Sequence, residues 1–110
     1  MGLEHPSVIT LGKRGDSKLD LSLPHGPSQI DIQKTDRGGQ ATLHSPGQLV
    51  IYPIVSLATL GLGVRDFVLT LLRTTQMSLH NLGIETFEKN QSALYTANGK
   101  IAFFGLKVSH

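Results

Sequence analysis

The longest regular pattern of apolar positions predicts one helix in the second half of the chain. Apolar residues recur at intervals of three and four from Val64 to Leu82, which is the spacing of one face of an amphipathic helix. Gly83 follows directly, and glycine is the usual residue where a helix ends in a left-handed turn. His80 falls in the last turn, where a positive charge would complement the helix dipole. We therefore expect a helix over 64–82 that ends at Gly83.

Shorter apolar patterns predict strands on both sides of this helix. Before the helix they are Ser7–Leu11, Ile30–Gln33, Thr42–His44 and Gln48–Val55, and after it Ile84–Phe87, Leu94–Ala97 and Lys100–Val108. The alternation in Ile30–Gln33 predicts a half-buried strand. The continuous apolar run Gln48–Val55 predicts a strand buried on both faces, with a bend or an edge at Pro53. Together these elements predict an α/β (α+β) fold in which the helix packs across a mixed sheet.

Glycine and proline mark the connections between these elements. Gly12–Gly15 reads as a turn, and Asp16–Gln29 reads as a polar loop because it holds two prolines and a glycine. Asn98-Gly99 lies between two apolar runs and predicts a tight hairpin. Side chains alternate along a strand, so two faces are expected after this turn. One face is Lys100, Ala102 and Phe104, and the other is Ile101, Phe103 and Gly105.

Composition limits the classes of protein that the chain can belong to. At 110 residues it is long enough for one small domain, and at 39% hydrophobic residues it is too apolar for a disordered segment. There is no cysteine, which excludes disulfides, thiolate metal sites and a cysteine nucleophile within these residues. No apolar run approaches the ~20 residues of a membrane span, and Met1–Pro6 does not read as a signal peptide. We therefore expect a cytoplasmic protein that does not bind a membrane.

Charge and motifs argue against several kinds of ligand. The net charge is +2, but the basic residues are scattered and only Lys13 and Arg14 are adjacent, so we expect no nucleic-acid partner. The five histidines lack the spacing of metal ligands, which predicts no metal site. No phosphate-binding or dinucleotide-binding glycine motif is complete, and no nucleophile elbow is present. We expect no cofactor.

Residues 36–48 are the most informative stretch for chemistry. The adjacent glycines Gly38 and Gly39 would let the backbone approach a ligand closely. Arg37 supplies a charged group, and His44 stands before the apolar run. The segment could hold a flexible chain and a carbonyl group. The alternative interpretation is a tight glycine turn with a solvated arginine and a hydrogen-bonded histidine.

Lys100 is a second candidate, because it stands directly after the predicted turn and begins an apolar strand. A lysine held against apolar surface loses solvation, which disfavours its charged form, and it can then work as a base or as the partner of a nucleophile. The alternative interpretation is an exposed lysine that protects the end of an edge strand.

Three segments of the chain resemble the octanoyl-acyl-carrier-protein:protein octanoyltransferases, the lipoate-protein ligase B family. Glu4–Gly12 resembles the family's Glu-His-Pro strand, and Asp36–Tyr52 its Arg-Gly-Gly, Thr-x-His and Pro-Gly-Gln signature. Lys100–Val108 resembles its lysine-bearing strand. The resemblance implies the fold of the biotin and lipoate protein ligases, a mixed sheet flanked by helices. It also implies that residues 1–110 form a single partial catalytic domain, the N-terminal part of that fold.

The resemblance further implies an activity, the transfer of an octanoyl group from acyl carrier protein to a lysine of a lipoyl domain. The expected recipients are the lipoyl domains of 2-oxoacid dehydrogenases and the glycine cleavage H protein. By match, Lys100 is the catalytic lysine that pairs with a cysteine. The implied acyl-binding residues are Arg37, Gly38, Gly39, Gln40, Ala41, Thr42, Leu43 and His44, with Phe103, Phe104 and Gly105 as a second piece. Lys100 and the Gly38–Gly39 segment are then expected to line one groove, with His44 at its rim.

The chain departs from the family pattern at important positions. The family's cysteine lies in its C-terminal part, and these 110 residues hold none. Ser45 stands where the family has glycine, and Phe103 stands where a small residue is usual. The alternative function is therefore a catalytically inactive fragment that binds an acyl group or a lipoyl domain.

Overall fold

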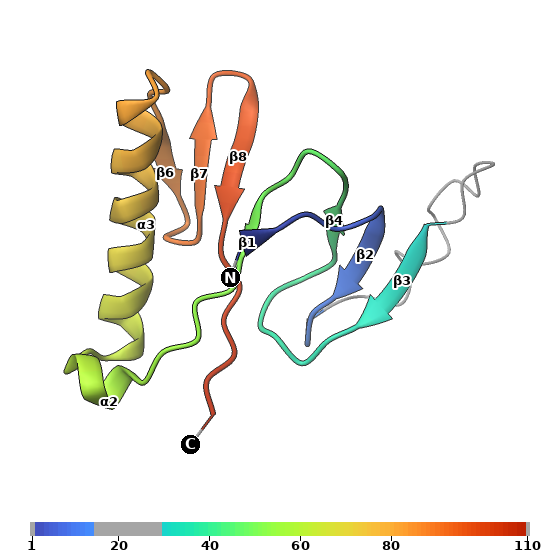
Figure 1. Cartoon of the computed structure of the whole chain (residues 1–110), viewed down its shortest axis with the longest axis horizontal. Helices are drawn as coiled ribbons and strands as arrows, with labels where there is room; N and C mark the ends of the chain where they lie inside the picture. Colours follow the sequence, from blue (N-terminus) through green and yellow to red (C-terminus); the bar gives the residue numbers. More distant parts are fainter. Residues whose placement is uncertain (1, 15–29, 110) are drawn as a thin grey trace. The chain divides into compact units, whose positions relative to one another are not determined.

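The computed structural model describes residues 2–14 and 30–109, and these combine strands and helices as the sequence predicts (Figure 1). They divide into two compact units, one up to Ile54 and the other over Val55–Val108. The predicted polar loop Asp16–Gln29 lies outside the described residues. The observed elements confirm the mixed α/β class.

The first unit is built from short strands in two small sheets. They are β1 (Gly2–Leu3), β2 (Val8–Leu11), β3 (Asp31–Lys34), β4 (Thr42–His44) and β5 (Val50–Ile51). β2 is the centre of a three-stranded sheet in which it runs parallel to β3 and antiparallel to β4, while β1 pairs with β5. The predicted strands around β2 and β4 are confirmed. Ile9 and Leu11 of β2 form the buried core of this unit.

Two predictions about burial in the first unit are wrong. The run Gln48–Val55 forms only the two-residue strand β5, and Ile54 is 93% exposed. β5 pairs only with β1, so in the described structure no further strand extends the sheet beyond it. β3 is exposed along its whole length, because it is an edge strand whose apolar residue Ile32 has no covering layer among the described residues. Apolar composition thus predicted burial that this unit does not provide.

The second unit begins with two helices. The short helix α2 (Leu57–Leu60), which the sequence pattern did not predict, begins where the Ser56 hydroxyl accepts a hydrogen bond from the Thr59 amide. The long helix α3 (Val64–Asn81) confirms the predicted helix. Gly83 has a φ of 81°, and the amides of Gly83 and Ile84 donate to carbonyls of the last turn. This paired arrangement is the Schellman ending that glycine favours, so the predicted end is also confirmed.

The second unit ends in an antiparallel sheet of three strands, β6 (Phe87–Lys89), β7 (Ala93–Thr96) and β8 (Gly99–Phe103), in the order β6-β7-β8. Strand β6 begins later than the predicted strand over residues 84–87. Helix α3 lies along this sheet and contacts β7 (Figure 1). Leu72 of α3 and Leu94 of β7 are almost completely buried and form the core of the unit.

The β7–β8 hairpin is present, but its turn and register differ from the prediction. Thr96 pairs with Gly99, so the turn residues are Ala97 and Asn98, and Gly99 follows them with a φ of 129°. The register then shifts, because Tyr95 pairs with Lys100 whereas Leu94 pairs with Ala102.

Ile101 is therefore the extra residue of a β-bulge. Residues paired across two strands share a face, and Tyr95 and Leu94 are on opposite faces of β7. Lys100 consequently lies on the face of Phe103, which itself pairs with Ala93. The predicted grouping of Lys100 with Ala102 is wrong, because a bulge breaks the alternation on which it relied.

Candidate functional site

Arg37 closes the glycine segment into a compact loop at the end of β2. Its Nη2 atom donates to the Thr10 carbonyl at 3.0 Å and to Thr10 Oγ1 at 2.6 Å. Its Nη1 atom donates to the carbonyls of Gly38 and Gln40 at 3.0 and 3.1 Å. We call this set of contacts the Arg37 clamp. The clamp uses the guanidinium to order the loop, so Arg37 is not the solvated side chain of the alternative interpretation.

Backbone contacts complete this loop. The amides of Lys13 and Arg14 donate to the carbonyls of Arg37 and Gly39, each at 3.0 Å. Gly12 is buried, and a Cβ atom built on it would lie 2.4 Å from the Gly39 carbonyl oxygen. The lack of a side chain at Gly12 therefore permits the close approach of the two segments.

Partial burial lowers the pKa of Arg37 from its ordinary value, and the Tyr52 phenol acts in the opposite direction. An arginine remains charged at neutral pH under such an influence. The loop thus carries a positively charged guanidinium, and its N–H groups donate mainly to backbone carbonyls.

His44 stands at the centre of a second group of polar side chains in the same unit. Its Nδ1 atom lies 2.8 Å from Gln48 Oε1, and its Nε2 atom lies 3.3 Å from Thr10 Oγ1. The ring of His5 lies 5.6 Å from that of His44, and His5 Nε2 lies 2.8 Å from the Tyr52 hydroxyl. His44 is half-buried and hydrogen-bonded, as the alternative interpretation of this segment predicts for the histidine.

Residue-by-residue analysis of chemistry missed Thr10, His5, Gln48 and Tyr52 as members of this group. They all lie in two of the three segments that carry the family resemblance, which is the signal that could have found them. Their meeting depends on the pairing of β2 with β4, where Thr10 stands opposite Thr42. A single residue pattern does not reveal such pairing.

The other predicted residues of the segment differ in exposure. Ala41 and Thr42 are half-buried, whereas Gln40 is exposed. Leu43 is 54% exposed, because β4 alternates and its neighbours Thr42 and His44 take the other face. The predicted acyl-binding residues 37–44 thus lie in one loop and one short strand.

Lys100 lies on a sheet face that carries aromatic rings in the second unit. Its Nζ atom is 5.6 Å from the centre of the Phe103 ring. On the same face, the Phe87 and Tyr95 rings stack at 6.1 Å, and Lys89 Nζ lies 5.0 Å from the Tyr95 ring centre. We call this surface the aromatic face. Each ammonium group lies within cation–π range of an aromatic ring, so this face combines positive charge with apolar ring surface.

Lys100 itself is exposed and stands on the edge strand β8. This exposure agrees with the alternative interpretation, in which the lysine protects a strand end, and not with a desolvated base. Phe104 is half-buried just beyond the strand, where its amide donates to the Ser92 carbonyl at 3.0 Å, and Gly105 is exposed. The predicted meeting of Lys100 with the Gly38–Gly39 segment joins residues of different units and stays a prediction.

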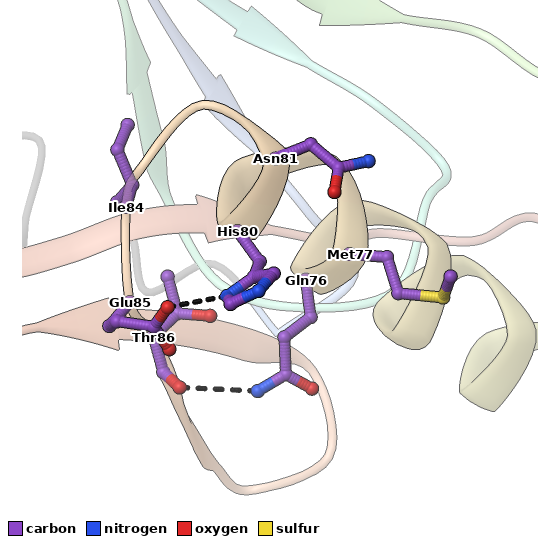
Figure 2. A pocket seen from close by; sticks show the side chains of 7 residues that line it. All are labelled: Gln76, Met77, His80, Asn81, Ile84, Glu85 and Thr86. Carbon is purple, nitrogen blue, oxygen red and sulfur yellow. Dashed lines mark hydrogen bonds and ion pairs between the residues drawn. The ribbon is translucent and has the colours of Figure 1, made fainter.

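A pocket of about 350 Å³ lies beside the end of α3 (Figure 2). Gln76 Nε2 donates to the Thr86 carbonyl at 3.1 Å, and His80 Nδ1 contacts the Glu85 carboxylate. Figure 2 shows that both contacts join the helix to the chain that follows Gly83. None of the predicted site residues lines this pocket. These contacts fasten the end of the helix to the start of the sheet.

Among residues 2–14 and 30–109, no group of three or more His, Asp or Glu side chains could hold a metal ion. In the same part of the chain, no helix is both long and apolar enough to cross a bilayer.

Comparison with known proteins places the chain in a family. The family model of the lipoyl protein ligase A/B catalytic domain matches residues 1–110. An octanoyltransferase of Cellvibrio japonicus (strain Ueda107) is 43% identical over 96% of this chain and 48% of its own length. Octanoyltransferases of Xylella fastidiosa (strain 9a5c) and Marinomonas sp. (strain MWYL1) are each 42% identical, over 98% and 96% of this chain.

The chain spans about half the length of the curated relatives that it matches. The match nevertheless covers the Arg37 clamp, the His44 group and the aromatic face, because the family model extends over every residue of the chain. The mixed α/β structure fits this family. The protein belongs to the lipoyl protein ligase A/B catalytic domain family.

Proposed function

We propose that this chain takes part in the transfer of an octanoyl group from acyl carrier protein to a lysine of a lipoyl domain. The observation that carries the proposal is its 43% identity to a relative named octanoyltransferase, spread over 96% of the chain. We also propose that residues 1–110 are part of a single catalytic domain. A cytoplasmic location belongs to the same proposal, and cell fractionation tests it.

The reaction proposed for the complete family domain has two acyl transfers. A cysteine thiolate attacks the carbonyl carbon of octanoyl-acyl carrier protein, a thioester forms on the cysteine, and the carrier leaves as a thiol. The amine of the target lysine then attacks the new thioester, an amide forms, and the cysteine leaves as a thiolate. The ammonium of Lys100 would stabilise the cysteine thiolate, would give its proton to the departing carrier thiolate, and would take a proton back from the attacking amine. These 110 residues contain no cysteine, so the nucleophile has to come from outside them.

Each of the two clusters, within its own unit, offers groups that suit an acyl substrate. The aromatic face offers Phe103 to the chain and the ammonium of Lys100 to the carbonyl end. The Arg37 clamp holds the backbone of Gly38–Gln40 in one conformation, which would let the loop border the chain closely. Residues Arg37–His44 and Phe103–Gly105 are the acyl-binding residues of this proposal.

The second candidate function is binding without catalysis. The observation that favours it is the lack of any cysteine in the 110 residues. In this case the chain binds an acyl group, or the lipoyl domain of a 2-oxoacid dehydrogenase or of the glycine cleavage H protein, and releases it unchanged.

Mass spectrometry distinguishes the two functions. The chain alone, incubated with octanoyl-acyl carrier protein, is expected to show no covalent octanoyl adduct. A chimera that joins this chain to the remainder of the Cellvibrio japonicus relative is expected to form the adduct and to acylate a lipoyl domain. A folded chimera that binds both partners but transfers nothing would leave only the binding function, whereas turnover by the chain alone would overturn the cysteine mechanism.

Lys100 is tested in the same chimera. Lys100→Ala is expected to abolish transfer with the fold intact, because an exposed lysine at a strand edge contributes little to stability. Lys34→Ala is the matched control, since Lys34 is also an exposed lysine of an edge strand, β3. Transfer by Lys100→Ala at the rate of the control would show that Lys100 has no catalytic role.

A further inference from the structure

Three hydrogen bonds connect four side chains of the first unit in a row. Arg37 Nη2 lies 2.6 Å from Thr10 Oγ1, which lies 3.3 Å from His44 Nε2. His44 Nδ1 lies 2.8 Å from Gln48 Oε1. The row passes from the Arg37 clamp through β2 to the end of β4 and the turn that follows it. In each hydrogen bond one of the two atoms supplies the hydrogen. The choice of donor in one bond therefore limits the choice in the next.

The hydrogens can be assigned from the arginine onward. A guanidinium only donates, so Thr10 Oγ1 accepts from Arg37. The hydroxyl keeps one hydrogen of its own, and within the described part of the chain the acceptor near it is His44 Nε2. His44 Nε2 must then be unprotonated (bare), because it accepts the hydrogen of the Thr10 hydroxyl. A neutral imidazole carries one hydrogen, which is left for Nδ1 and donates to Gln48 Oε1.

Two other arrangements of the hydrogens satisfy these hydrogen-bonding groups less well. With the Gln48 amide turned round, its NH₂ group would donate to Nδ1 and His44 Nε2–H would donate to Thr10. The Thr10 hydroxyl would then receive two hydrogens, and its own would have no acceptor among the described residues. A doubly protonated His44 would direct a second cation at the hydroxyl that already accepts from Arg37, and would stand 5.6 Å from the His5 ring.

We infer that Thr10 and Gln48 hold His44 in the Nδ1–H tautomer and make it a positioning residue that neither gives nor takes a proton in the reaction. Nε2 of His44 ties β4 to Thr10 in the Arg37 clamp, and Nδ1 ties it to Gln48 in the turn that follows β4. The tautomer assignment is independent of the proposed function, and only its consequence for the reaction rests on that function.

NMR of the full chain labelled with ¹⁵N in histidine tests the tautomer directly. Long-range proton–nitrogen correlation distinguishes a protonated ring nitrogen from a bare one, and the His44→Gln variant identifies which of the five histidine patterns is lost. We expect His44 to show a protonated Nδ1 and a bare Nε2 at neutral pH. A bare Nδ1, or protons on both nitrogens, would overturn the inference.

Variants of Thr10 test the cause. Thr10→Val removes the hydroxyl, so we expect the population of His44 with a bare Nε2 to fall relative to the other tautomer. Thr10→Ser keeps the hydroxyl and should keep the wild-type pattern. Thr70→Val is the control, because among the described residues the Thr70 hydroxyl donates within its own helix, to the Asp66 carbonyl. Unchanged His44 signals in a folded Thr10→Val chain would refute the role of Thr10. Should that variant fail to fold, the wild-type and Thr10→Ser spectra decide.

The consequence for the reaction has a separate readout. In the chimera, His44→Gln is expected to lower the rate without changing the shape of its pH profile, because no proton passes through His44. The loss of one limb of that profile would make His44 an acid or a base and would overturn this part of the inference. A chimera that transfers nothing would sink the proposed function instead, and the NMR result would stand on its own.

Discussion

Gly12→Ala adds a single methyl group, and we expect it to destabilise the first unit strongly. The new Cβ atom would lie 2.4 Å from the Gly39 carbonyl oxygen and 2.8 Å from Arg37 Nη1, whereas ordinary contact begins at 3.4 Å. The Gly39 carbonyl therefore has to retreat by about 1 Å. That movement strains the bond that it accepts from the Arg14 amide and the neighbouring bond from Lys13 to Arg37.

The expected cost follows from these contacts. Overpacking of this kind costs about 1–3 kcal/mol, and each backbone hydrogen bond that is lost adds about 1 kcal/mol. We expect Gly12→Ala to reduce the free energy of unfolding by about 2–4 kcal/mol. With a urea slope of about 1–2 kcal/mol per molar, the unfolding midpoint should fall by at least about 1 M.

Urea unfolding followed by circular dichroism measures this change, and the amide signals of Gly38 and Gly39 report on the loop. Gly2→Ala is the matched control in the same unit, because among the described residues its Cβ would make ordinary contact with Leu49 Cδ1 at 3.4 Å and Ile51 Cγ1 at 3.8 Å. The control should stay within about 0.5 kcal/mol of the wild type. A Gly12→Ala midpoint equal to that of the control, with the Gly38 and Gly39 signals in place, would refute the close approach.

Three further changes test other parts of the structure. Leu94→Ala should destabilise the second unit by about 3–4 kcal/mol in urea unfolding, because Leu94 of β7 is fully buried, while Met77→Ala, at a side chain that is 67% exposed, should cost far less. Gly83→Ala should cost about 1 kcal/mol and lower the helical signal, since its φ of 81° disfavours a side chain, and equal stability would contradict the left-handed ending of α3. The family resemblance implies that acyl carrier protein and lipoyl domains are acidic, so binding of the chain to either should weaken between roughly 0.05 and 0.5 M salt, as exposed charges become screened. Calorimetry that finds no salt dependence would contradict electrostatic docking.

Local signals made part of the fold predictable. Helix α3 and its end at Gly83 depend on the spacing of residues within one segment and on the φ that glycine allows, and both were found from the sequence. The run Gln48–Val55 shows the opposite case. Its burial depends on which elements cover it, and a local pattern does not contain that information. The register of β8 also escaped prediction, because the bulge at Ile101 arises from pairing with β7.

The candidate site divides in the same way. The family resemblance marked Arg37, His44 and Lys100, because their residue types are fixed by motifs. It did not reveal that Arg37 is bonded to the backbone around it, or that Lys100 lies beside Phe103. Both facts depend on contacts between strands and loops, which only the folded chain brings together.

The Arg37 clamp has a consequence for the entropy of binding. One side chain fixes the backbone of Gly38–Gln40, a stretch that includes two glycines and would otherwise sample many conformations. Ordering the backbone of one residue costs about 1–2 kcal/mol, so ordering these three would cost about 3–6 kcal/mol. Because folding of the chain has already met that cost, a ligand that docks on this loop keeps its contact energy as affinity. The arginine thus preorganises the loop without having to touch the ligand.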